Sequence, residues 1–206
     1  TGYIKFGQLI IQISGFSITG GTFLRAGTKI HFGVKVLATD NWQNLVHSGQ
    51  LVTVTTEDPS DTHPPAQSMN QGYTNFTNVA MVTSSTWTVT ASASGVNPGT
   101  SAGVFIRPNV PARLAIYAPG EQPEPGYTLT RGRKHGLTHT TQTAGAYFEL
   151  TVRACDNWYN MTTATPSVTV RIDDWDIDNQ VYRITRTKDL VDGTTTFSVR
   201  LAAAKV

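Results

Sequence analysis

Three aspartates near residue 175 have the type and spacing that favour a bound cation. Asp174, Asp176 and Asp178 alternate as D-x-D-x-D, and such carboxylates converge on Ca²⁺ where the backbone curls around the ion. The segment is not an EF-hand loop, because Thr185 stands where the bidentate Glu belongs. Two interpretations stay open: a calcium site at these three residues, or a strand end with outward carboxylates. The sparser acidic segment 57–61 is a weaker candidate of the same kind.

Two copies of the motif D-N-W-x-N, at 40–44 and 156–160, place an aromatic ring beside amide and carboxylate groups. Rings beside amides suit carbohydrate, so Trp42, Trp158 and Tyr159 are candidate sugar-binding residues. The alternative is structural, because Asp and Asn side chains in turns bond their own backbone, and the Trp would then cover the end of a β-sandwich. Repetition in both halves of the chain favours the structural interpretation.

The remaining reactive side chains form no recognisable catalytic set. Cys155 lies in an alternating stretch without a neighbouring base, which favours a small strand residue over a nucleophile. His135 and His139 have the i, i+4 spacing of a helical zinc site, but the surrounding Gly and Thr predict a basic loop. Motifs for acyl transfer, phosphate binding and metalloproteolysis are absent from the sequence. We therefore expect a protein that is not an enzyme, with calcium as its candidate cofactor.

Composition narrows the fold class and the partners. The chain has 206 residues, a formal net charge of +2 and only 15% charged residues, so no strong field attracts nucleic acid or an anionic membrane. No apolar run approaches the roughly 20 residues of a spanning helix. Threonine makes up roughly 15% of the chain, beside 18 Gly and 10 Pro, a bias towards strands and turns. Strands must therefore position the candidate sites.

The sequence also repeats itself. Five blocks recur in the same order, and their offset drifts from 105 residues at the first block to 121 at the last. The paired blocks are 8–15 with 113–120, 26–27 with 144–145, 29–44 with 146–160, 51–55 with 167–171, and 72–76 with 193–197. The drifting offset places insertions in the second copy, chiefly the Pro-, Gly- and Thr-rich segment 121–143, which reads as a long surface loop.

The blocks have the two-residue period of half-buried strands. We therefore predict an all-β fold of two tandem immunoglobulin-like antiparallel β-sandwich domains, 1–109 and 110–206. After residue 76 the first copy continues through two strand-like stretches, 85–93 and 102–107, for which the second copy has no counterpart. The second domain is thus expected to lack its last strands, which leaves an open sheet edge and a bare core face.

The run A-x-D-N-W-x-N at 38–44 and 154–160, the Ala-Gly start and the later G-x-x-x-F resemble bacterial immunoglobulin-like repeats of the invasin and intimin type. These are tandem modules of large surface proteins, and the resemblance covers most of the chain. It implies an extracellular, cell-surface location, no catalytic residues, and a role as stalk, adhesin spacer or array-forming module. The loop 121–143 departs from it, because a compact domain of this kind needs a shorter connection.

The bare edge has two interpretations. Either the chain is a piece of a longer protein that supplies the last strands, or a neighbouring copy supplies them by strand exchange. The N-terminal segment 1–14 carries apolar residues in an extended run and is the candidate donor strand. The expected partners are therefore copies of the chain or adjacent immunoglobulin-like domains. Surface glycans are a further candidate partner at the basic cluster Arg131, Arg133 and Lys134, whereas nucleic acid and membrane insertion are not expected.

These observations favour a structural extracellular protein, either an immunoglobulin-like stalk or a self-assembling filament or surface-layer module. The alternative is a carbohydrate-binding or adhesin module, attached to a glycan-active enzyme or acting alone. The alternative would use the three aromatic residues of the D-N-W-x-N motifs.

Overall fold

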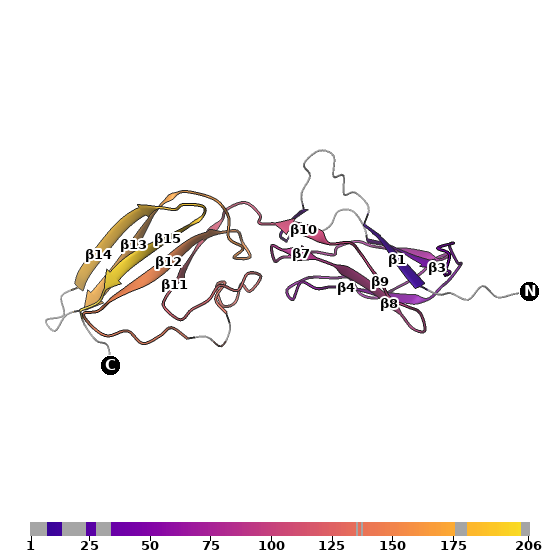
Figure 1. Cartoon of the computed structure of the whole chain (residues 1–206), viewed down its shortest axis with the longest axis horizontal. Coiled ribbons are helices and arrows are strands. Elements are labelled where there is room, and N and C mark those ends of the chain that lie inside the picture. The colour runs from indigo at the N-terminus through magenta and orange to yellow at the C-terminus, as the bar shows by residue number, and fades with distance from the viewer. Residues whose placement is uncertain are drawn as a thin grey trace, which may run out of the picture. The chain divides into compact units, whose positions relative to one another are not determined.

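Strands, turns and loops make up the part of the chain that the structure describes. The computed structural model describes residues 8–13, 24–27, 34–134, 136, 138–175 and 181–202, in which strands occur without any helix. The all-β prediction is therefore confirmed for these residues, and none of them belongs to a helix of membrane-spanning length and hydropathy. The chain divides into two compact units, which we call unit 1 (Thr1–Arg107) and unit 2 (Pro108–Val206). Figure 1 traces the strands of both.

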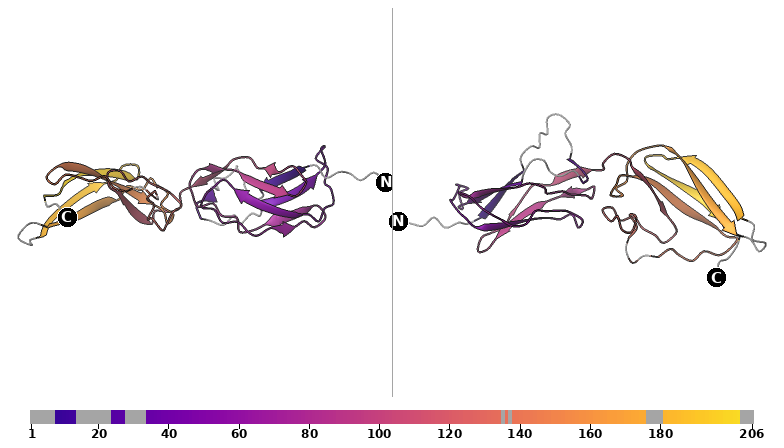
Figure 2. Two further views of the ribbon diagram at one scale, coloured as in Figure 1. Left: turned by 90° about the horizontal axis from the view of Figure 1, so that it is seen from below. Right: turned by 180° about the vertical axis from the view of Figure 1, so that it is seen from behind.

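Unit 1 contains two principal antiparallel sheets. The first has the order β1 (Gln8–Ile13), β3 (Val34–Thr39), β6 (Tyr73–Phe76), and the second has the order β5 (Gln67–Ser68), β4 (Leu51–Thr56), β8 (Val89–Ala93), β9 (Gly99–Thr100). A third, small sheet joins β2 (Leu24–Arg25), β10 (Val104–Arg107) and β7 (Thr86–Trp87), with β2 parallel to β10. The two principal sheets lie in separate layers, as Figure 1 shows from the front and Figure 2 from behind.

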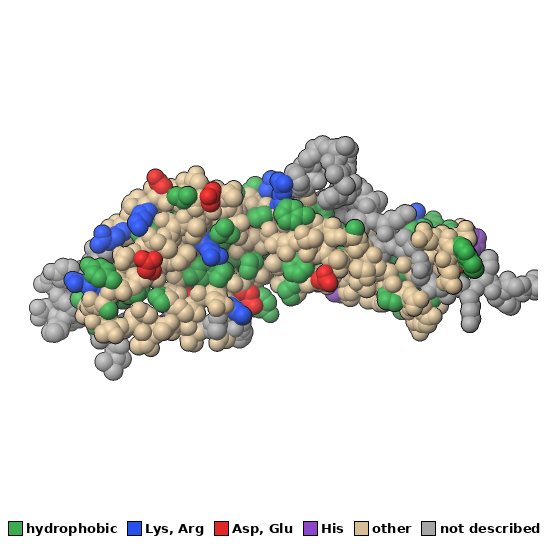
Figure 3. All heavy atoms as spheres, in the orientation of Figure 1, with side chains coloured by type: hydrophobic (Ala, Val, Ile, Leu, Met, Phe, Trp, Pro, Cys, Tyr) green, Lys and Arg blue, Asp and Glu red, His purple; other side chains and the backbone are tan. Residues whose placement is uncertain are grey.

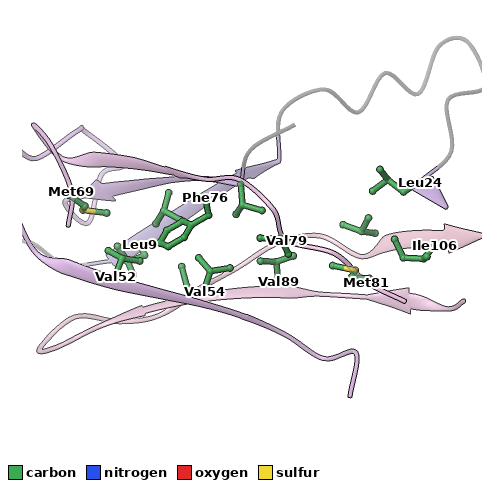
Figure 4. Close-up of a cluster of buried hydrophobic side chains, with 14 of the residues drawn as sticks. Leu9, Leu24, Val52, Val54, Met69, Phe76, Val79, Met81, Val89 and Ile106 are labelled. Carbon is green, nitrogen blue, oxygen red and sulfur yellow. The ribbon is translucent and has the colours of Figure 1, made fainter. Parts of the chain in front are cut away.

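Alternate side chains from these strands fill the space between the layers of unit 1. Leu9 of β1, Phe76 of β6, and Val52 and Val54 of β4 all belong to one buried cluster (Figure 4). The intervening positions of β4 are exposed or half-buried Thr and Leu side chains. This alternation is the reason that a sequence rich in Val and Thr forms half-buried strands here.

Unit 2 has fewer strands in its described part. One sheet has the order β11 (Arg113–Tyr117), β12 (Tyr147–Cys155), β15 (Thr194–Arg200), and the other is the long hairpin of β13 (Ser167–Trp175) and β14 (Val181–Asp189). Its core contains Val152, Ala154, Val168, Val170, Leu190, Phe197 and Val199. After β15 no further strand occurs in the described residues, as the sequence predicts for the second copy.

Strands pair in the same register in both units, when residues of unit 1 are matched to those of unit 2 by the offsets of the sequence blocks. The corresponding pairs are Leu9↔Ala38 and Leu114↔Ala154, Val34↔Phe76 and Leu150↔Phe197, and Leu51↔Ser68 and Ser167↔Asp189. By these registers β12 corresponds to β3, β13 to β4, and β14 to β5. The position that β8 holds beside β4 in unit 1 has no strand in the described part of unit 2.

The structure differs from the expected donor strand at the N-terminus. Residues 8–13 of that segment form β1, which pairs along its whole length with β3 of the same unit. Leu9 is buried in the core of unit 1, so its burial holds this strand in place. The rest of the expected donor, residues 1–7 and 14, lies outside the described residues.

Two glycines with the same backbone conformation provide a test of the strand packing. Gly193, just before β15, has φ +80°, and a Cβ there would overlap the carbonyl oxygen of Thr162. Gly145 has φ +81° but open space around it. We expect Gly193→Ala to destabilise unit 2 by about 3 kcal/mol or more, and Gly145→Ala by only about 1 kcal/mol. Urea unfolding followed by hydrogen exchange measures both, and equal losses would contradict this packing.

Candidate functional site

The D-N-W-x-N segment of unit 2 forms a turn centred on a buried carboxylate. Asp156 Oδ1 accepts the backbone N–H groups of Trp158 (2.9 Å) and Asn160 (3.0 Å), and Oδ2 accepts the Asn160 side-chain amide (2.9 Å). Oδ2 also accepts the backbone N–H of Asn109 (2.9 Å). Asp156 is fully buried, so these four donors compensate the loss of water around its charge.

The same turn occurs in unit 1. Asp40 Oδ1 accepts the backbone N–H groups of Trp42 and Asn44 (both 2.9 Å), and Oδ2 accepts the Asn44 amide (3.0 Å). The Asn44 side-chain hydrogen bond, with the backbone bonds of Asn44 and Trp42, holds the pKa of the Asp40 carboxyl below its usual value, against an opposing effect of burial. The stabilisation is therefore present at neutral pH and fades as the pH falls below about 4. Gln43 and Tyr159, at the matching position of each turn, both have positive φ.

The three candidate sugar-binding rings differ in accessibility. Trp42 is 82% exposed, Trp158 is half-buried, and Tyr159 is buried with its ring 5.4 Å from the Arg113 guanidinium. The expectation that the Trp covers the end of the sandwich is therefore wrong for Trp42, whose turn is held by Asp40 without help from the indole. Trp42 and the pair Trp158 and Tyr159 belong to different units.

The candidate calcium residues lie mostly outside the described part of the chain. The backbone of Asp174 belongs to β13, opposite Tyr182, but its side chain is not described. Asp176 and Asp178 lie outside the described residues, as does His135. Among the residues that are described, no three His, Cys, Asp or Glu side chains gather closely enough to hold a metal ion. The calcium site stays a prediction.

In the acidic segment 57–61, the Asp58 carboxylate has a structural role that the composition of the segment did not reveal. Asp58 is buried, and its Oδ2 accepts the backbone N–H groups of Val82 (2.7 Å) and Thr83 (2.9 Å), while Oδ1 accepts that of Ser60 (3.1 Å). The carboxylate therefore ties this turn to a segment more than twenty residues away. Because these donors occupy both oxygens, Asp58 is not a free cation ligand.

The first part of the long loop, residues 121–133, packs against the sheet of unit 2, whereas residues 138–143 are exposed. Arg133, expected in an open basic cluster, forms an ion pair with Glu121 (3.2 Å) and donates to the Ile116 carbonyl of β11 (2.9 Å). Tyr117 donates its hydroxyl hydrogen to the Gly132 carbonyl (3.2 Å). Arg131, Lys134 and His139 are exposed, so the basic cluster keeps only part of the expected charge.

Cys155 lies beneath this loop. It is fully buried in a small cluster with Ala115, Tyr117 and Tyr159, on the outer face of the sheet, opposite the core between the layers. Burial raises the pKa of the thiol to about 11, with a smaller contribution from the Asp156 charge. Cys155 belongs to a strand, as the sequence predicts, but the sequence does not reveal that the inserted loop covers it.

The inner face of β11 carries two exposed apolar side chains. Leu114 is 53% exposed and Ile116 is 40% exposed, although they stand opposite the buried residues Ala154 and Val152 of β12. Sequence reasoning did not single them out as a site, but the alignment of Leu114 with Leu9 across the repeat marks the position.

Charge is sparse over the face shown in Figure 3, where uncharged polar side chains and backbone predominate and charged side chains stand mostly apart.

Comparison with known proteins gives only remote similarities. No protein-family model matches the chain, and no curated protein matches it. Among solved structures it is similar to the Yersinia pseudotuberculosis adhesin InvE, with 16% identity over 87% of this chain and a TM-score of 0.36. The chain spans about half of that structure, covering 49% of it.

Two further solved structures have similarly low sequence identities and TM-scores. One is to domains 5–6 of the S-layer protein SbsC, with 13% identity, coverage of 95% of this chain and 100% of the other, and a TM-score of 0.30. The other is to a Salmonella alpha-2-macroglobulin, with 10% identity, coverage of 95% and 14%, and a TM-score of 0.28. The first two neighbours are thus an adhesin and an S-layer protein.

The Asp156 turn leads to a stability prediction. Asp156→Ala removes the acceptor of four hydrogen bonds and leaves buried backbone N–H groups unpaired, so unit 2 should lose about 3 kcal/mol of unfolding free energy. Asp156→Asn should lose nearly as much, because an amide NH₂ would replace one oxygen that accepts from Asn160 and Asn109. Denaturant unfolding resolved by unit measures the loss. A change below about 0.5 kcal/mol would show that the turn does not depend on this carboxylate.

The buried thiol leads to a reactivity prediction. Since the rise in pKa lowers the thiolate fraction about 100-fold at neutral pH, Cys155 should react with Ellman's reagent at least 100-fold more slowly in the folded chain than in denaturant. It is the sole cysteine of the sequence, so the signal has one source. Labelling of the native chain at the rate of the unfolded chain would mean that the loop does not cover this face.

Proposed function

We propose that the chain is a pair of tandem immunoglobulin-like modules of a structural extracellular protein, serving as a stalk or as part of a surface array. The observation that carries the proposal is the repetition of sheet order, register and Asp-centred turn in both units, at the offsets of the sequence blocks. A folding unit that is repeated in tandem with the same Asp-centred turn is suited to an extended, multi-domain protein.

The use of the reactive side chains supports a non-catalytic role. Asp40, Asp58 and Asp156 hold turns, and Cys155 lies in an apolar cluster. Each of these groups would otherwise be a candidate acid, base, ligand or nucleophile. We therefore propose that function rests on the shape and surface of the strands rather than on a reaction.

A second candidate function is carbohydrate binding at Trp42. Its indole is exposed while its turn is fixed by Asp40, a combination that presents a rigid aromatic face to solvent. Trp158 and Tyr159 are less accessible, so this alternative centres on unit 1.

Surface location is tested by immunogold labelling of intact cells of the source organism. We expect label on intact cells, removed by brief protease treatment, with regular spacing if the modules belong to an array. Label that appears only after permeabilisation would overturn the proposal.

A glycan array separates the two candidate functions. For a structural module we expect no saturable binding by the 206-residue chain. Saturable binding that Trp42→Ala abolishes, while the matched loop variant Leu45→Ala keeps it, would instead establish the carbohydrate-binding function. Leu45 is an exposed apolar residue of the same loop, so it controls for a general loss of apolar surface.

A further inference from the structure

The second sheet of unit 2 has two strands among the described residues, where its counterpart in unit 1 has four. In unit 1, β4 lies between β5 and β8, and β9 follows β8. In unit 2, β14 takes the side of β5, because Ser167↔Asp189 repeats the pairing Leu51↔Ser68. The other edge of β13 pairs with no strand among the described residues. An edge of this kind is a template for a further strand.

Unit 1 shows what the missing strands do. The backbone N–H of Leu9 donates to the Asn97 carbonyl (3.2 Å), in the turn between β8 and β9. Gly99 of β9 approaches β1 so closely that a Cβ there would overlap the Leu9 carbonyl oxygen. The hairpin thus lies directly on β1, and Leu9 is only 3% exposed.

Unit 2 has the same inner face without that cover. Leu114, which corresponds to Leu9 by register, and Ile116 stand on the inner face of β11 and are 53% and 40% exposed. Beyond them a hollow of about 530 Å³ is lined by Ala118 after β11, by Phe148 of β12, by Leu201 and by residues 139–144. An apolar strip therefore runs along β11 into this hollow.

We propose that the open edge of β13 and the inner face of β11 form a docking site for a β-hairpin supplied by another polypeptide segment. Its first strand would be antiparallel to β13 and would alternate Val and Ala with Thr and Ser, as Val89–Ala93 does in unit 1. This inference concerns only the fold of unit 2, and it does not depend on the surface location proposed above.

The register of unit 1 fixes the expected pairing. There Val52 is opposite Ala93, and Val54 is opposite Ala91. Transferred by the equivalence of β4 and β13, a docked hairpin would place its alanines opposite Val168 and Val170, both of which face the core of unit 2. Small inward residues are required, because the hairpin must approach β11 as closely as Gly99 approaches β1.

A partner segment fits better than a second copy of this chain. The chain's own hairpin is already paired with β4 and covers Leu9 in unit 1. Using it in trans would uncover one core in order to cover another, with no net gain in buried area. We therefore expect the partner to supply a weakly charged β-hairpin that is not already part of another sheet.

The test uses a fluorescent synthetic peptide with the sequence of residues 86–107, titrated into the 206-residue chain. We expect saturable binding with a rise in the melting temperature of unit 2. Leu114→Lys and Ile116→Lys should each weaken binding at least tenfold. Leu129→Lys is the matched control, because Leu129 is 94% exposed on the loop of the same unit, and it should bind like the unchanged chain.

A second arm varies the peptide and leaves the protein unchanged. The Ala91→Lys peptide should fail to bind, since its side chain would meet β13 and the core. Absence of saturable binding by the unchanged peptide would overturn the proposal, and so would equal binding by the Leu114→Lys chain. Self-association of the chain alone, abolished by Leu114→Lys, would also overturn it by identifying a second copy as the occupant.

Discussion

The inner face of a three-stranded sheet needs cover across its full width, because each Leu or Ile left in water forfeits about 1.5–3 kcal/mol of burial free energy. In unit 1 that cover is four strands wide, and β8 and β9 lie over β1. In unit 2 the described cover is a hairpin of two strands, which leaves the inner face of β11 exposed. The smaller core of unit 2 follows from this difference, as does its open edge.

The two faces of the β11–β12–β15 sheet differ in how far other segments cover them. On the outer face the inserted loop covers Tyr117, Cys155 and Tyr159, and the hydrogen bond from Arg133 to the Ile116 carbonyl ties the loop to β11. On the inner face no described segment covers Leu114. The inserted loop thus packs on the outer face, while Leu114 and Ile116 stay exposed on the side where the repeat is incomplete.

Much of this arrangement could be predicted from the sequence, because alternation and self-similarity are local signals. The repeat offsets correctly anticipate the absence of late strands in the described part of unit 2. The roles of Asp58 and Arg133 could not be predicted, since their partners lie far along the chain and only the folded loops bring them together. The indole of Trp42 is exposed, and its turn is held by the Asp40 carboxylate and by backbone hydrogen bonds within the turn.

Residue-resolved hydrogen exchange on the 206-residue chain tests the open edge most directly. Successive amides of a strand point to opposite edges, so we expect every second amide of β13, those directed away from β14, to exchange at nearly unprotected rates. All amides of β4 that pair with β5 or β8 should be protected. Uniform protection along β13, equal to that of β4, would contradict an open edge and the docking site built on it.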